Sequence, residues 1–143
     1  MYRAVDREGN TVDFRLSARR DTVAAKAFFR KAIKSQESAP ETITLDGYAA
    51  SHRAVREMKI DRELPKETRV RSSKYLNNLI EQDHRGVKSR IGPMLGLKWF
   101  TTAAIVIAGI ELSHRIHKGQ FDLRRLHLKD RSTSAVWNAV LAA

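Results

Sequence analysis

The chain has 143 residues, which is enough for one domain with a hydrophobic core. Hydrophobic residues make up 42% of it and fall in periodic segments, which excludes a disordered chain. Lys and Arg (27) exceed Asp and Glu (16) by 11. This excess favours a polyanionic partner, because each phosphate that a protein neutralises releases counterions. There is no cysteine, so disulfides, zinc–thiolate sites and cysteine nucleophiles are excluded.

The first residues predict a strand and no signal peptide. The longest uncharged run covers residues 99–110 and is too short for a bilayer, which needs about 18 apolar residues. We therefore expect no membrane association and a cytoplasmic protein. The run itself predicts a buried helix, with Trp99 and Phe100 in the core.

The first elements in chain order are a hairpin and an amphipathic helix. Residues 2–6 and 11–16 are strand-like, and Gly9 and Asn10 supply the turn between them. From residue 21 the apolar positions recur at three- and four-residue steps, which predicts a helix over 21–35 with Asp21 as its N-cap. Residues 37–40 end that helix, and 42–45 form a third strand that leads to Asp46.

Further along, the pattern predicts a helix over 49–58, a short strand around Val70, and helices over 76–91 and 98–117. The tail, 120–143, is basic in its first half and apolar in its second. No linker divides the chain, so we expect one domain over 1–119 with the tail as part of it. Strands that alternate with helices predict an α/β fold in which helices flank a mixed sheet.

Two distant carboxylates are candidates for a metal site. Asp46 follows a strand, a usual place for site residues in open α/β folds, and thirty-four residues separate it from Glu81, which lies inside a predicted helix. His84 and Lys88 fall on the same face of that helix, with Lys88 about 10 Å beyond Glu81. Such a pair could bind Mg²⁺, which takes oxygen ligands. The plain alternative is a solvated helix face.

The segments YRAVDREGNTVDFRLSARRD and YLNNLIEQDHRGVKSR, with Asp46, Glu81 and Lys88 at their spacing, closely resemble DDE transposases of bacterial insertion sequences, in the insertion sequence 6 family. The similarity runs from Tyr2 to the last residues. It implies a ribonuclease-H-like (integrase-type) catalytic domain that performs DNA transposition, a form of DNA recombination, by magnesium-dependent phosphoryl transfer.

The resemblance also implies roles for single residues. Asp46 would be the second and Glu81 the third acid of the triad, and both would hold Mg²⁺ or Mn²⁺, with two ions in the complete enzyme. Lys88 would contact the transposon end, and we expect the neighbouring His84, Arg85 and Arg90 to face DNA as well. The implied partners are transposon-end and target DNA and a second copy of the protein, in the bacterial cytoplasm close to the nucleoid.

The family's first acid and its DNA-recognition helices have no counterpart in this sequence. We therefore expect a truncated transposase whose ribonuclease-H-like sheet lacks the first strand, and which is inactive, marginally stable and poorly soluble because strand edges are left unpaired. Two alternatives stay open. One is a non-catalytic DNA-binding module or a dominant-negative dimerisation partner of the intact transposase. The other is an active nuclease in which Asp6 or Asp13 replaces the first acid.

Overall fold

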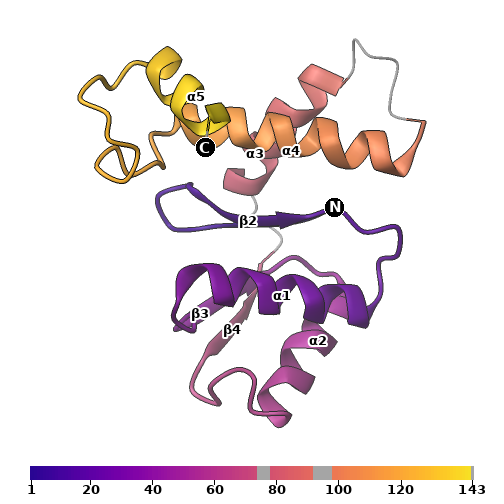
Figure 1. Cartoon of the computed structure of the whole chain (residues 1–143). Helices are drawn as coiled ribbons and strands as arrows, with labels where there is room; N and C mark the ends of the chain where they lie inside the picture. The colour runs from indigo at the N-terminus through magenta and orange to yellow at the C-terminus, as the bar shows by residue number, and fades with distance from the viewer. Residues whose placement is uncertain (74–77, 92–97, 143) are drawn as a thin grey trace. The chain divides into compact units, whose positions relative to one another are not determined.

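The computed structural model describes residues 1–73, 78–91 and 98–142, with the side chains of 78–84 outside the described part. The chain divides into two compact units, Met1–Gly86 and Val87–Ala143. Figure 1 shows the elements of both units, with labels on all of them except β1. The first unit carries the turn after Asp46.

The chain begins with the expected hairpin. Strand β1 (Tyr2–Val5) pairs antiparallel with β2 (Thr11–Arg15), with a register shift between Ala4 and Val5. The turn is held by Asp6, whose two carboxylate oxygens accept hydrogen bonds from the backbone and the side-chain amide of Asn10 at 2.7 and 3.0 Å. Gly9 has a φ of 82°, a left-handed conformation that glycine adopts without strain.

Helix α1 (Thr22–Gln36) begins where the sequence predicts. The carboxylate of Asp21 accepts a hydrogen bond from the backbone N–H of Ala24 at 2.8 Å and so satisfies one of the unpaired donors of the first turn. The helix ends at Glu37, which has a left-handed φ of 57° and donates its backbone N–H to Lys34. Pro40 follows shortly afterwards and cannot continue a helix.

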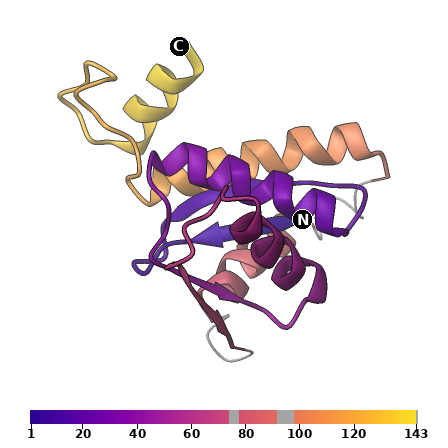
Figure 2. The ribbon, with the colours of Figure 1, turned by 90° about the horizontal axis from the view of Figure 1, so that it is seen from below.

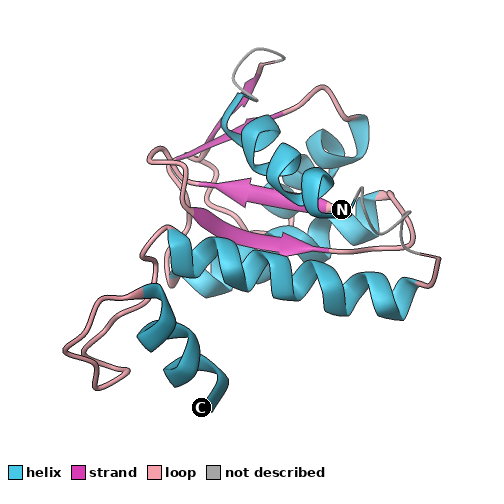
Figure 3. Cartoon of the chain, turned by 90° about the horizontal axis from the view of Figure 1, so that it is seen from above, coloured by secondary structure: helices cyan, strands magenta, loops and turns pink. Residues whose placement is uncertain are grey.

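A second sheet follows α1. Strand β3 (Thr42–Leu45) pairs in parallel with β4 (Arg69–Ser72), and helix α2 (Ala49–Ile60) connects them. Thr42 and Thr44 lie opposite Arg69 and Arg71 in this register, so these four residues share one face of the pair. Figure 3 shows the two pairs of strands in magenta, separate from each other.

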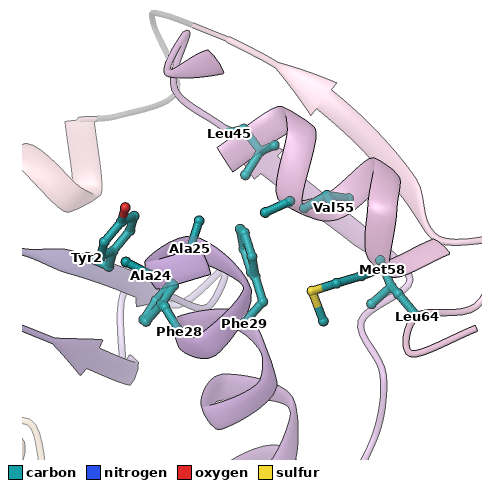
Figure 4. Packing of buried hydrophobic residues seen from close by; sticks show 10 residues of the cluster. Tyr2, Ala24, Ala25, Phe28, Phe29, Leu45, Val55, Met58 and Leu64 are labelled. Carbon is teal, nitrogen blue, oxygen red and sulfur yellow. The ribbon is translucent and has the colours of Figure 1, made fainter. Parts of the chain in front are cut away.

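Helix α1 is the centre of the first unit because it packs on both sides. Toward the hairpin, the ring of Phe28 stacks on Tyr2 with 5.6 Å between the ring centroids. Toward α2, Phe29 joins Val55 and Met58, as Figure 4 shows. These side chains are buried, and burial of one large apolar side chain stabilises the fold by about 1.5–3 kcal/mol. The rest of the cluster consists of Ala24, Ala25, Leu45, Ala54 and Leu64.

Helix α3 (Asn78–Ile91) crosses from the first unit into the second. Within the second unit, α4 (Phe100–His117) leads through a loop to α5 (Thr133–Ala142), and these two helices are in contact (Figure 2). The expected tail after residue 120 therefore ends in a helix. Among the described helices, none is both long enough and apolar enough to cross a bilayer.

The expectation that Trp99 and Phe100 are core residues is wrong. Trp99 is 74% and Phe100 51% exposed, and Ile105 on the same helix is 74% exposed. Helix α4 is apolar around most of its circumference, and only part of that surface packs against a neighbouring element. Ile107 and Ile116 of the same helix are buried, on opposite faces of it.

The α/β class is confirmed, and every predicted strand is found. The described strands form two two-stranded sheets, one antiparallel and one parallel, so a single continuous mixed sheet is not present in the described part of the chain.

Candidate active site around Asp46

Asp46 stands at the end of β3, where the chain leaves the sheet. Leu45, the residue before it, is 6% exposed and anchors the strand in the core, whereas Asp46 itself is exposed. Alternation along a strand places consecutive side chains on opposite faces, so burial of Leu45 directs the next side chain outward. The sequence thus places an exposed carboxylate directly after a strand whose last residue is buried in the core.

The turn after Asp46 is held by two hydrogen bonds to this residue. Its carboxylate oxygen Oδ1 accepts the backbone N–H of Tyr48 at 3.3 Å, as in an Asx turn. Its backbone carbonyl lies 3.0 Å from Nε2 of His52, one turn into α2. In the tautomer that carries the proton on Nε2, His52 donates to this carbonyl. Both contacts limit the directions in which the Asp46 carboxylate can point.

A third contact ties this turn to the start of α1. The Tyr48 hydroxyl donates a hydrogen bond to the backbone carbonyl of Arg20, twenty-eight residues earlier in the chain. The guanidinium of Arg20 lies over the Tyr48 ring, with its central carbon 4.5 Å from the ring centroid. Sequence reasoning did not single out Arg20 or Tyr48. An aromatic residue two positions after the candidate Asp was the available signal.

Glu81 and His84 lie on α3, but their side chains are outside the described residues. The backbone of 78–91 is helical, so Glu81 and Lys88 are two turns apart on one helix face, as expected. Arg85, Lys88 and Arg90 are all exposed. Each of these three cations can therefore reach a ligand from solvent.

Asp6 and Asp13, the two candidates for a relocated first acid, both have structural partners in the hairpin. Asp6 binds Asn10 through both oxygens. Oδ1 of Asp13 accepts the Nζ of Lys31 at 2.9 Å and the backbone N–H of Phe14 at 2.7 Å. Among the side chains that the structure describes, no three His, Asp or Glu groups lie close enough to share a metal ion.

The chemistry of Asp46 nevertheless fits a hard divalent cation. Its carboxylate is exposed, it accepts one backbone N–H through Oδ1, and the described residues place no Lys or Arg in an ion pair with it. Oxygen ligands of this kind are the ones that Mg²⁺ and Mn²⁺ take. One carboxylate does not make a metal site, so at least one further ligand is needed.

Comparisons with known proteins find a family and relatives that match this chain. The profile of a family described as a DDE domain matches residues 1–120. The chain is 36% identical over 118 residues to the transposase for insertion sequence-like element IS431mec of Staphylococcus aureus, and equally to the transposase for insertion sequence element IS257 in transposon Tn4003 of the same species. Each alignment covers 82% of this chain and 50% of the relative. No solved structure matches the chain.

The chain thus spans about half the length of the curated relatives that it matches. The match includes the hairpin, the Asp46 turn and the α3 segment with Glu81 and Lys88, which are the parts that carry the sequence resemblance. On these matches the chain belongs to the DDE transposases of bacterial insertion sequences, in the insertion sequence 6 family.

Proposed function

We propose that this chain contributes the second and third carboxylates, Asp46 and Glu81, to a DDE site that cuts and joins DNA in transposition. The observation that carries the proposal is the exposed Asp46 on a turn held by three hydrogen bonds, in a chain that matches the DDE domain over residues 1–120. The excess of 11 positive charges suits a polyanionic substrate.

Asp46 and Glu81 would hold Mg²⁺ or Mn²⁺, with two ions in the complete enzyme. When bound, the ions stabilise negative charge on the attacking and leaving oxygens of the phosphodiester. The protein's own part is to orient these two carboxylates. Tyr48 and His52 orient Asp46, and the helical backbone of α3 keeps Glu81 and Lys88 on the same face of that helix.

Lys88 binds the backbone of the transposon end, and Arg85 and Arg90, with His84, extend the same DNA-binding segment. Their exposure and the charge of the chain support this role for the two arginines and the lysine. Because Lys88 is exposed, its removal should weaken DNA binding more than folding.

The strand arrangement supports a ribonuclease-H-like sheet without its first strand. In the described part of the chain β1 pairs only with β2, and β3 only with β4. In the parallel ladder Arg69 and Ser73 donate to Glu41 and Leu45. The N–H and C=O groups of Thr42 and Thr44 therefore point to the other edge of β3. An added strand could pair there, and an open edge of this kind promotes association between chains.

The proposal predicts that the 143-residue chain binds DNA but does not cut it, because it presents two of the three acids. The test is fluorescence anisotropy with a duplex, followed by incubation with supercoiled DNA and Mg²⁺ or Mn²⁺. If the wild-type chain nicks the supercoiled DNA and the Glu81→Gln variant does not, the prediction that this chain is inactive is wrong. Absence of salt-dependent duplex binding would overturn the DNA-binding role.

A matched pair of variants tests Lys88 itself. Loss of one phosphate contact lowers the slope of log K against log salt by about 0.9. We expect this change for Lys88→Gln and an unchanged slope for Lys34→Gln, which removes an exposed lysine at the end of α1. Equal slopes for the two variants would remove Lys88 from the DNA-binding segment.

The alternative function, a non-catalytic partner that pairs with an intact transposase, is favoured by the exposed apolar side chains of Trp99, Phe100 and Ile105. Exposed apolar side chains mark association sites where they form a contiguous patch, and α4, which follows Trp99 and carries the other two, is the candidate element. Sedimentation of the wild type and Ile105→Glu tests it. A dimer that the substitution dissociates supports this alternative, and a monomeric wild type rejects it.

A further inference from the structure

Four side chains gather where the start of α1 meets the turn after β3, and we call them the Tyr48 cluster: Tyr2, Arg20, Asp21 and Tyr48. The Tyr48 hydroxyl donates to the Arg20 carbonyl, and the Tyr2 hydroxyl donates to the Asp21 carbonyl at 3.2 Å. Burial, and then the neighbouring Tyr48, raise the pKa of Tyr2, while the positive charge of Arg20 opposes the rise. The cluster therefore places the Arg20 charge close to both phenols.

The guanidinium of Arg20 lies over the Tyr48 ring, and the side chain is exposed. Its central carbon lies 4.5 Å from the Tyr48 ring centroid, a distance at which the ring face attracts the cation. A stacked guanidinium keeps its N–H groups in the plane, where they form the fork that pairs with two oxygens of one phosphate.

Arg20 also keeps its full charge for a ligand. The guanidinium groups of Arg30 and Arg53 are each paired with a carboxylate, Glu63 and Glu57 respectively. For Arg20, the described residues include no carboxylate in an ion pair with its side chain. A stacked, exposed and unneutralised arginine differs from these two surface pairs, whose charges already cancel.

Arg20 lies near Asp46 because both residues contact Tyr48. The ring on which Arg20 stacks belongs to Tyr48, and the backbone N–H of Tyr48 donates to Oδ1 of Asp46. Arg20 and Asp46 thus both contact Tyr48, Arg20 through the ring and hydroxyl and Asp46 through the backbone N–H. A polyanion that approaches Asp46 meets repulsion from this carboxylate, and a cation at the same turn offsets it.

We propose that Arg20 binds a phosphate group of the DNA backbone beside Asp46, and that the Tyr48 ring holds its guanidinium in place. This inference rests on the proposed function, since it takes DNA as the substrate. It adds a binding residue from the start of α1 to a site otherwise built from the β3 turn and α3.

The test is the salt dependence of duplex binding by the whole chain, between about 50 and 200 mM salt. Arg20→Gln should lower the slope of log K against log salt by about 0.9 and weaken binding about eightfold at 0.1 M salt. Arg56→Gln is the matched control, because Arg56 is an exposed arginine on α2 of the same unit. Arg20→Lys should restore the slope, since it restores the charge.

Three outcomes overturn the inference, and a fourth separates it from the proposed function. If Arg20→Gln leaves the slope unchanged, or if Arg56→Gln lowers it equally, Arg20 has no special contact with phosphate. If the wild type does not bind the duplex at all, the proposed function fails as well. Melting curves of both variants check folding. Should Arg20→Gln fail to fold, an Arg20→Lys variant that lowers affinity at an unchanged slope supports the inference, and one with wild-type affinity overturns it.

Discussion

Truncation of Met58 to alanine should destabilise the first unit strongly. Met58 is 1% exposed on the side of α2 that faces α1, where it joins Phe29 and Leu64 (Figure 4). Replacement by alanine removes Cγ, Sδ and Cε from a closed cluster, and such changes cost about 2–5 kcal/mol. With a total stability of about 5–15 kcal/mol for a domain, the loss is a large fraction of the whole.

The assay is urea denaturation followed by circular dichroism, with the free energy of unfolding extrapolated to water. Ile60→Ala is the matched control, because Ile60 ends the same helix and is 72% exposed. We expect the control to change stability by less than about 0.5 kcal/mol. If Met58→Ala and Ile60→Ala lower the free energy of unfolding by the same small amount, α2 does not pack on α1 as described. The packing that fixes the helix after the Asp46 turn would then be refuted as well.

Two further predictions concern the helices around this core. Asp21→Ala should lower the free energy of unfolding by about 1 kcal/mol in the same assay, because the N-cap of α1 is lost. Asp21→Asn should keep most of the stability of the wild type, because asparagine also caps helices. An equal loss for both variants would contradict the capping role. The pKa of Glu57 is lowered by its hydrogen bonds to Lys26 and then Arg53, and the pKa of Glu63 by its hydrogen bond to Arg30. Their stabilising effect is present above the unfolded pKa of about 4.5 and is lost as the pH falls below it. The double variant Glu57→Gln, Glu63→Gln should flatten the fall of the urea midpoint between pH 5 and pH 3, and an unchanged fall would show that other carboxylates cause it.

The expected low stability and solubility of the isolated chain stays a prediction. Its physical reason is the open edge of β3, where the backbone groups of Thr42 and Thr44 lack a partner strand in the described part of the chain. Reversible, cooperative melting of a monomer at high temperature would contradict it.

Local patterns were enough to predict most of the elements. The alternation in residues 11–16 and the turn residues Gly9 and Asn10 predict the hairpin, and Asp21 marks the first turn of α1. The end of β3 at Asp46 follows from Gly47, which turns the chain. These signals depend on neighbours within a few residues, so the sequence carries them directly. The apolar run after Trp99 predicted a helix correctly but not its burial, because burial depends on what packs against it.

The sequence by itself determined the family, the elements and the exposed acid after β3, because motif spacing, periodicity and strand ends are local properties. Only the tertiary structure decided that Arg20 stacks on Tyr48, that Lys31 binds Asp13, and that the strands form two separate pairs. These contacts join residues far apart in the chain. They arise from the way α1 packs between the hairpin and α2, and no pattern within a short window of sequence records that packing.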